Sequence, residues 1–390
     1  LPGVRIARIE SGLWLENIQE SQLKQLALIP GFANYAEAVK VKNTVEDIKK
    51  GVDVIAQLSS QFLTCHSEQS EESLSQSPNG QRSFATLRMT KGGVGQTQNN
   101  KQTFRISAER SYKKFPLSSL EIEKEIGEYA RVKYGWQVSL GKQDLNIHIA
   151  VGSDQAIIFG NTENTAGGLP TSTSGKVLAF LSGGIDIPVA AYKMMCRGAE
   201  VGLIHFQNQT QVTDEVIEKI FDLAKVLAKY QPEIKLFMVP FADIQKQIIM
   251  KVPAQYRMIV TRRIFNKIAE KIAKKNNYLA LVSGDSLGQV ASQTLENMAV
   301  IANATDLLKL NPLIGANKKD IIDLARKIGA LDISARPYED CCSLFIAKHP
   351  ATKSKLNEIL KYEKMIDETV IDKTEIISYY ISKNLICVIR

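Results

Sequence analysis

The stretch SGGIDIP, residues 182–188, combines the residues that a phosphate-binding turn needs. It directly follows the apolar run 177–181, and Pro188 falls where the first turn of a helix is expected. Gly183 and Gly184 let the backbone turn its N–H groups inward without a Cβ atom in the way. A helix N-terminus adds free N–H groups and the positive end of a dipole, so the stretch beginning at Ser182 predicts a phosphate site. A purely structural tight turn is the alternative.

Asp186 is the acidic residue of this stretch. Its carboxylate would repel a phosphate group unless a divalent cation lay between them, or unless the side chain capped the helix. We expect Mg²⁺ as the bridge, with capping as the alternative. Other phosphate-binding patterns do not fit: GxGxxG is absent, and STSGKV (172–177) precedes its strand and has valine where the Walker pattern needs Ser or Thr.

The cysteines form a second group with chemical potential. There are five, at positions 65, 196, 341, 342 and 387, without the spacing of a zinc site or of a secreted disulfide framework. Cys341 and Cys342 are adjacent, and we interpret them as reduced thiols; a thiolate can accept or pass on sulfur. Burial of one of them as a packing residue is the alternative.

The elements that must position these residues alternate from residue 176 onward. Four short apolar runs have the character of fully buried parallel strands: 177–182, 201–206, 234–240 and 279–284. Helical stretches lie between them, which predicts a doubly wound α/β domain. In such sheets ligands bind beyond the carboxyl ends of the strands.

The preceding part of the chain has a different texture. Residues 12–42 and the helical pattern at 44–62 predict a small α+β sandwich. Residues 64–102 are rich in Ser, Gln, Asn and Gly, which predicts a flexible insert. Beyond it we expect a strand at 102–116, a helix opened by a capping box at Ser118 and Glu121, and a hairpin at 144–160.

The charge balance favours an anionic partner. Lys plus Arg outnumber Asp plus Glu by 49 to 41, a formal net charge of +8. Basic residues gather around the expected strand 102–116: Arg105, Arg110, Lys113 and Lys114. They predict contacts with a phosphate backbone, with a solvated surface as the alternative. No run of eighteen apolar residues is present, so we expect no membrane span, and the free cysteines suggest a cytoplasmic setting. The first residues suggest a start inside a domain rather than a signal peptide.

Several of these stretches resemble a known family. SGGIDIP resembles the SGGxDS signature of the PP-loop ATP pyrophosphatases, which cleave ATP between its α- and β-phosphates to adenylate a substrate. Four wider stretches narrow the resemblance to the ThiI family of tRNA sulfurtransferases: GGLPTSTSGKVLAFLSGGIDIPVAAY, SGDSLGQVASQTLENM, NPLIGANKKDIIDLARKIGA and RPYEDCCSLF. TFRISAERSYKKFP is similar to the RNA-binding THUMP domain of that family.

The resemblance implies a division of the chain. A ferredoxin-like domain would span residues 1–45, and a THUMP domain with the insert 64–102 would span residues 46–165. A PP-loop domain of the adenine nucleotide α-hydrolase-like type, a doubly wound parallel sheet, would span residues 166–390.

The resemblance also implies site residues. ATP would be bound by Phe180, Leu181, Ser182, Gly183, Gly184, Ile187, His205, Phe206, Arg262, Gly284 and Gln293. Asp186 would bind the metal, Lys318 would act on the phosphates with Lys319 as an open alternative, and Cys341 or Cys342 would handle sulfur. Ile187 stands where the family has serine, which predicts weakened ATP binding. The expectation is a member of the family without the rhodanese domain that some relatives carry.

The implied function is the conversion of a uridine at tRNA position 8 to 4-thiouridine. ATP, with Mg²⁺, would adenylate the C4 oxygen, and sulfur from a cysteine desulfurase persulfide would then replace that oxygen. The resemblance further implies a homodimer and, in some relatives, a role in thiamine thiazole synthesis. Two alternatives remain: a PP-loop synthetase acting on a small molecule, and a catalytically impaired tRNA-binding protein.

Overall fold

The computed structural model describes residues 4–9, 12–72, 102–207, 214–336, 347, 349–367, 376–382 and 385–389, with the side chains of residues 8, 9, 12, 20, 60–72, 214 and 389 left out. The chain divides into two compact units. Unit 2 comprises residues 34–164, and unit 1 comprises the segments on either side of it, residues 1–33 and 165–390. We describe each unit by itself.

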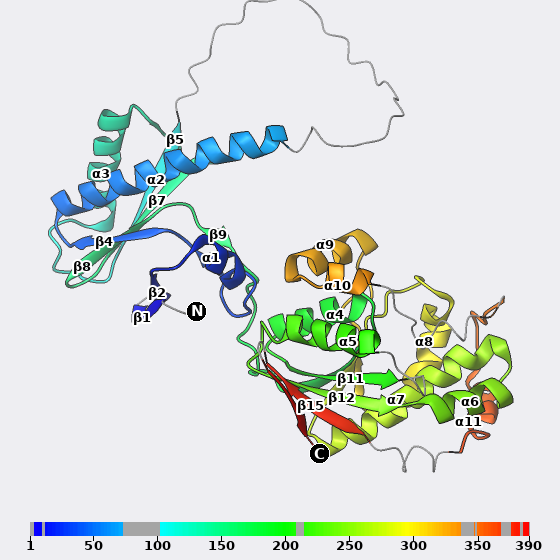
Figure 1. The fold of residues 1–390 in the computed structure, drawn as a ribbon. Helices are drawn as coiled ribbons and strands as arrows, with labels where there is room; N and C mark the ends of the chain where they lie inside the picture. The colour runs from blue at the N-terminus through cyan, green and yellow to red at the C-terminus, as the bar shows by residue number, and fades with distance from the viewer. Residues whose placement is uncertain are drawn as a thin grey trace, which may run out of the picture. The chain divides into compact units, whose positions relative to one another are not determined.

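Unit 2 is a five-stranded sheet with two helices. The strands follow one another in the order β4 (Ala38–Lys42), β8 (Gln155–Phe159), β7 (Leu145–Val151), β5 (Thr103–Arg110) and β6 (Gln137–Val138). Helices α2 (Val45–Glu72) and α3 (Ser119–Tyr134) cover one face (Figure 1). Alternate residues of β7 are buried, as a sheet covered on one face requires. The expected hairpin is confirmed, because β7 and β8 pair in antiparallel fashion.

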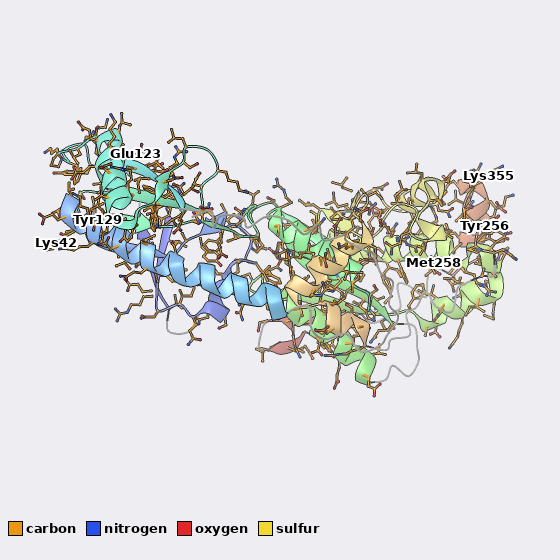
Figure 2. All side chains as sticks on the ribbon, turned by 90° about the horizontal axis from the view of Figure 1, so that it is seen from above. Lys42, Glu123, Tyr129, Tyr256, Met258 and Lys355 are labelled. Atoms are coloured by element: carbon orange, nitrogen blue, oxygen red, sulfur yellow. The ribbon has the colours of Figure 1, made fainter. Side chains whose placement is uncertain are left out.

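The helices of unit 2 are fixed by local signals and by one polar contact. The capping box is confirmed: Ser118 Oγ accepts from the Glu121 backbone N–H, and the Glu121 carboxylate accepts from the Ser118 N–H. The hydroxyl group of Tyr129, a residue labelled in Figure 2, donates to the Asp53 carboxylate at 3.0 Å and so joins α3 to α2.

The N-terminal part of the chain differs from the expected arrangement. Strand β4 pairs with β8, and α2 packs on the same sheet, so the boundary expected after residue 45 falls inside unit 2. The short strands β3 (Asn34–Tyr35) and β9 (Glu163–Asn164) also pair with each other. The cause is burial: Val39 and Val41 pack against the apolar core of unit 2. Residues 64–72 of the expected insert continue α2, and residues 73–101 lie outside the described residues.

Unit 1 is built on a seven-stranded sheet. Its order is β14 (Leu308–Leu310), β13 (Ala280–Val282), β10 (Lys176–Phe180), β11 (Glu200–Gln207), β12 (Ile234–Pro240), β15 (Ile377–Ile381) and β16 (Ile386–Ile389). The pairs from β14 to β12 are parallel, which confirms the four predicted strands and the doubly wound α/β class. Strands β15 and β16 add an antiparallel edge that the sequence did not predict.

Helices cover both faces of this sheet (Figure 1). One buried apolar cluster joins the sheet to α4 (Asp186–Cys196), α5 (Asp214–Leu227) and α9 (Lys318–Ile328), with α10 (Leu331–Ala335) beside them. A second joins it to α6 (Ala242–Lys251), α7 (Arg257–Lys275), α8 (Leu295–Ala302) and α11 (Leu356–Glu363). With both faces covered, the carboxyl ends of the parallel strands are the open edge at which ligands bind in this fold class.

The first segment of unit 1 is small. Strands β1 (Arg5–Ile9) and β2 (Gly12–Glu16) form a two-stranded sheet, followed by α1 (Glu20–Leu26). The chain beyond α1 is attached to the large sheet, since the hydroxyl group of Tyr192 in α4 donates to the Leu28 carbonyl at 2.8 Å. Within the described part of the chain, no helix is long and apolar enough to cross a membrane.

Candidate functional site

The predicted phosphate turn leads from β10 into α4, which begins at Asp186. The backbone N–H of Gly184 lies 3.4 Å from Ser182 Oγ, so the serine hydroxyl folds back over the turn. The first N–H groups of any α-helix lack acceptors within the helix. Backbone donors are therefore available where the sequence predicted them.

Asp186 does not act as the helix cap. Ile185 holds the cap position, and no side chain caps this end of α4. Instead, Asp186 Oδ1 accepts from Lys318 Nζ at 2.7 Å, and Gln289 Nε2 lies 3.4 Å from the other carboxylate oxygen. The structure thus brings Lys318, the first residue of α9, to the phosphate turn.

Gly284 lets the segment after β13 approach this turn closely. A Cβ atom at position 284 would lie 2.9 Å from Asp186 Cβ and 3.0 Å from the Asp186 carbonyl carbon. Real Cβ contacts are not that short, so an alanine here would force the turn and the β13 segment apart. The glycine is required by this approach.

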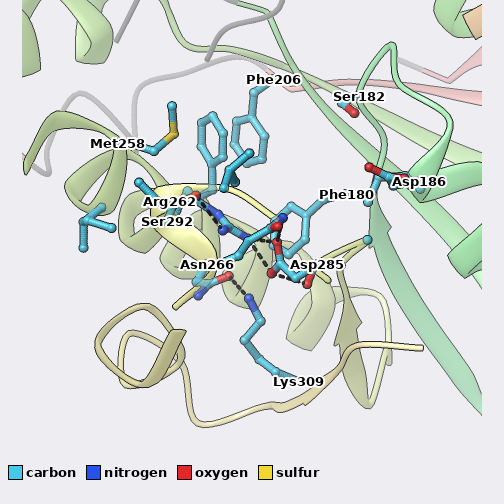
Figure 3. Close-up of a pocket in the computed structure, with 18 of the residues that line it drawn as sticks. Phe180, Ser182, Asp186, Phe206, Met258, Arg262, Asn266, Asp285, Ser292 and Lys309 are labelled. Carbon is cyan, nitrogen blue, oxygen red and sulfur yellow. Dashed lines mark hydrogen bonds and ion pairs between the residues drawn. The ribbon is translucent and has the colours of Figure 1, made fainter. Parts of the chain in front are cut away.

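A cavity of about 620 Å³ opens at the carboxyl ends of β10, β11 and β13 (Figure 3). Most of the residues expected to bind ATP line it, together with the expected metal ligand Asp186: Phe180, Leu181, Ser182, Ile187, His205, Phe206, Arg262, Gly284 and Gln293. Gly183 and Gly184 belong to the same turn without lining the cavity, and Lys318 reaches it through Asp186. The structure therefore gathers residues from four separate stretches into one place.

Aromatic rings form one wall of the cavity. The ring of Phe206 stacks on Phe265, with 3.9 Å between the ring centroids and 11° between the planes. One face of Phe206 is thus covered by protein, and Phe206 is buried. Phe180 lies 6.4 Å from Phe206, centroid to centroid. Phe265 and Met258, which the sequence did not predict as site residues, also line the cavity.

Arg262 and Asp285 both line the cavity and form an ion pair there (Figure 3). Arg262 Nη2 donates to both Asp285 carboxylate oxygens, at 2.6 and 2.5 Å, and Gln293 Nε2 donates to Oδ1 at 3.0 Å. Burial alone would raise the pKa of Asp285, but the charge of Arg262 and its hydrogen bonds lower that pKa below the usual value. Asp285 is therefore ionised and holds Arg262 in place.

Lys309 of β14 lies below this pair in Figure 3. Its Nζ atom donates to Asn266 Oδ1 at 3.1 Å and lies 5.5 Å from the centroid of the Phe180 ring. Burial and the positive charge of Arg262 lower the pKa of Lys309 to about 8, against an opposing effect of Asp285. Sequence reasoning missed Lys309, Asp285 and Asn266.

The spacing of residues along α7 could have identified some of these missed site residues. Met258, Arg262, Phe265 and Asn266 are spaced as i, i+4, i+7 and i+8 within α7, so they share one helix face. Once Arg262 is placed in the site, its helical neighbours follow. Lys309 gives no comparable signal, because the short strand β14 can be placed only by its pairing with β13.

His205 joins the ends of two strands. Its Nδ1 atom lies 2.8 Å from the Leu181 carbonyl oxygen, which accepts only from a protonated nitrogen, so Nδ1 carries a hydrogen. The backbone N–H of Leu181 in turn donates to the Ile204 carbonyl at 2.7 Å. These bonds fix the edge of the cavity.

The cysteines are only partly visible. Cys341 and Cys342 lie outside the described residues. Cys196 is half-buried, and burial raises the pKa of its thiol, whereas Cys387 is exposed on β16. Among the described residues no group of three or more His, Cys, Asp or Glu side chains could hold a metal ion by itself.

The basic residues expected to bind RNA lie in unit 2. Arg105 and Arg110 are on β5, and Lys113 and Lys114 follow it with exposed side chains. Arg110 Nη1 donates to the carbonyl oxygens of Phe115 and Leu117, at 3.1 and 2.9 Å. Arg110 therefore folds the loop that presents the two lysines.

Known protein families match segments of both units. The ThiI family model, described as thiamine biosynthesis protein, matches residues 172–367, and the THUMP domain model matches residues 95–160. A probable tRNA sulfurtransferase of Caldanaerobacter subterraneus subsp. tengcongensis is 44% identical over 268 residues, which is 68% of this chain and 70% of that protein. One from Thermoanaerobacter pseudethanolicus is 40% identical over 292 residues, 73% of this chain and 75% of the relative.

Solved structures are similar as well. A 4-thiouridine synthetase crystallised with RNA and bound ATP has a TM-score of 0.75 and 27% identity, over 96% of this chain and 91% of that one. A protein from Pyrococcus horikoshii, with a TM-score of 0.55 and 18% identity, covers 84% of this chain and 87% of its own and shares the fold.

Proposed function

The chain belongs to the ThiI family, and from this premise we propose that it is an ATP-dependent tRNA sulfurtransferase that makes 4-thiouridine. The target we propose is the uridine at tRNA position 8. The observation that carries the proposal is the phosphate turn at residues 182–187, which opens into the cavity beside the Asp186–Lys318 ion pair. A second role in thiamine thiazole synthesis would match the family's description.

The cavity fits a nucleotide on two observations. Gln293 Oε1 is buried and has no hydrogen-bond partner among the described residues. The orientation of the Gln293 amide is set by its Nε2 group, which donates to the Asp285 carboxylate. Gln293 Oε1 is therefore free to accept a hydrogen bond from a ligand hydroxyl or amine. At Gly284 the backbone meets the phosphate turn without a Cβ atom, so the segment after β13 lies directly against the residues that would hold the phosphates.

Mg²⁺ fits as a companion of the phosphates. Asp186 is 25% exposed, and Mg²⁺ in phosphoryl-transfer sites is held by one or two carboxylates together with substrate phosphates and water. Asp186 would supply the carboxylate, while Lys318 would turn its charge toward the phosphates. No described cluster of ligands would hold the ion alone.

The chain's own residues would bind and orient the reactants. ATP supplies the adenylyl group that converts the C4 oxygen of uracil into part of a leaving group. Backbone N–H groups of the turn and of α4 would hold the phosphate oxygens at the positive end of the helix dipole. Arg262, held by Asp285, would donate to the nucleotide, and Lys318 would neutralise the charge that develops on pyrophosphate.

Sulfur would enter through a cysteine. We propose Cys341 or Cys342 as the residue that handles it, with a cysteine desulfurase as the persulfide donor in a reducing cytoplasm. Lys113 and Lys114, supported by Arg105 and Arg110, would contact the tRNA backbone, and a homodimer is the proposed assembly. The exposure of both lysines on a loop folded by Arg110 supports the RNA contact.

Pyrophosphate exchange tests the function. We expect labelled pyrophosphate to enter ATP only when tRNA and Mg²⁺ are present, because the adenylated group is a tRNA base. Exchange without tRNA would favour a small-molecule synthetase, and tRNA binding without exchange would favour an impaired RNA-binding protein. Mass spectrometry of tRNA from cells carrying Cys341→Ser or Cys342→Ser would then show which thiol is needed.

A further inference from the structure

The charged groups of the cavity are not all paired with one another. Arg262 is neutralised by Asp285, and Asp186 by Lys318. Lys309 has no carboxylate within 4.0 Å among the described residues. Asn266 Oδ1 is the acceptor that these residues offer to its ammonium group, and the Phe180 ring lies beside it.

The position of Lys309 ties it to the Arg262–Asp285 pair. Asn266 and Arg262 are one helical turn apart on α7, so the lysine approaches the helix directly behind the arginine. The charged groups that face Lys309 are Arg262 from α7 and Asp285 from the segment after β13. Strand β10 contributes the uncharged ring of Phe180, and α7 the uncharged amide of Asn266.

We propose that Lys309 is a positioning residue for nucleotide binding, whose ammonium group supports Asp285 while Arg262 engages the nucleotide. When Arg262 turns part of its hydrogen bonding toward a phosphate or ribose oxygen, Asp285 loses part of its counter-charge. Lys309 is then the second cation near this buried carboxylate. The inference rests on the proposed function, since it takes Arg262 as a contact of ATP.

This role makes nucleotide binding depend on pH. The pKa of Lys309 is about 8, so a growing fraction of the side chain is neutral above that pH. An anionic nucleotide favours the ammonium form, so binding above pH 8 must take up a proton. We therefore expect ATP affinity to fall as the pH rises from 7 to 9, although nucleotide phosphates are fully ionised across most of that range.

Isothermal titration calorimetry of the full chain with ATP tests the proposal, using buffers of different ionisation enthalpy at pH 7, 8 and 9. For the unmodified protein we expect affinity about tenfold weaker at pH 9 than at pH 7, with about half a proton taken up at pH 8. Lys309→Arg should bind with little change over this range and without that uptake, because arginine stays charged. Lys309→Met should bind about tenfold more weakly at pH 7 and lose the pH dependence.

Lys235, near the amino end of β12, provides a matched control. Lys235 of β12 donates to Asn276 Oδ1 at 2.8 Å and lies 5.1 Å from the Phe237 ring, yet lines a different cavity. Lys235→Met should leave ATP affinity and its pH dependence unchanged. In pyrophosphate exchange, Lys309→Met should raise KM for ATP about tenfold and leave kcat within about twofold.

Stability separates this role from a structural one. Lys309→Met removes a half-buried charge, so its thermal midpoint should equal or exceed that of the unmodified protein. Unchanged ATP affinity and proton uptake in Lys309→Met would overturn the inference alone. Failure of the unmodified protein to bind ATP would overturn the proposed function, and the inference with it.

Discussion

At the scale of single residues, Ile187 occupies two environments at once. It lines the cavity as the second residue of α4, and it is 7% exposed and packs into the apolar cluster beneath that helix. A serine at this position would offer a hydroxyl to a phosphate oxygen and lose that packing. The isoleucine therefore favours stability at the expense of one donor in the site.

Ile187→Ser should separate these two effects. A hydrogen bond to a charged group is worth about 1.5–3 kcal/mol, so we expect ATP affinity to rise about tenfold or more. Unfolding in denaturant should show a loss of about 2–5 kcal/mol, as for other truncations of a buried isoleucine. Ile187→Ala is the control, with a similar stability loss and no gain in affinity. Equal ATP affinity in all three proteins would contradict the role given to the hydroxyl.

Gly284→Ala tests the close approach at the phosphate turn. The new methyl group would meet Asp186 Cβ at 2.9 Å, so the turn must shift, and overpacking of this kind costs about 1–3 kcal/mol. We expect ATP affinity measured by calorimetry to fall at least tenfold. Gly141→Ala in unit 2 is the control, because a Cβ atom there meets no neighbour within 4 Å. Normal affinity in Gly284→Ala would show that the approach is not needed.

At the scale of elements, the start of α9 presents two adjacent lysines to different surroundings. Lys318 reaches Asp186, whereas Lys319 is exposed and has no ion pair with a described residue. The sequence left the choice between them open. The structure favours Lys318, because successive residues of a helix point about 100° apart and only Lys318 of the two forms an ion pair with a described residue.

Lys318→Met should therefore be far more damaging than Lys319→Met. Removing a cation that meets charge developing in the transition state costs about 10²-fold or more in kcat. We expect that loss in tRNA-dependent pyrophosphate exchange for Lys318→Met, and a change of at most about twofold for Lys319→Met. The reverse order would transfer the proposed role to Lys319.

Elements whose signal is local were predictable from the sequence. The buried strands from β10 to β13 appear as continuous apolar runs, and Ser118 with Glu121 marks the start of α3. The turn between β10 and α4 and the close approach at Gly284 could be expected from the sequence, because glycines next to a strand end have a specific use. Pairing between distant segments has no such signature: β4 pairs with β8 more than a hundred residues later, and no local pattern in residues 38–42 names that partner.

The same limit applies to the site. Arg262 was placed in it by resemblance, but its partner Asp285 is 23 residues away and is brought to it by the packing of α7 against β13. Lys309 required the additional knowledge that β14 lies next to β13. The cavity's charge balance is thus a property of the tertiary structure.

At the scale of the whole molecule, unit 2 carries the residues proposed for tRNA and unit 1 those proposed for ATP. The double variant Lys113→Ala with Lys114→Ala should weaken tRNA binding about tenfold at moderate salt. Each lost phosphate contact should reduce the slope of log K against log salt by about 0.9. ATP affinity without tRNA should not change. Lys361→Ala with Lys364→Ala, an equal charge change on exposed lysines of unit 1, is the control. An unaltered salt slope in the unit 2 variant would remove these lysines from the interface.

The insertion of unit 2 within unit 1 determines the order in which the two units can fold during translation. All of residues 34–164 leave the ribosome before the sheet of unit 1 exists, so unit 2 can acquire its core during translation. The segment after α1 must wait, because the hydroxyl group that binds the Leu28 carbonyl belongs to a tyrosine 164 residues further on. At about 5–20 residues per second, that delay lasts roughly ten to thirty seconds.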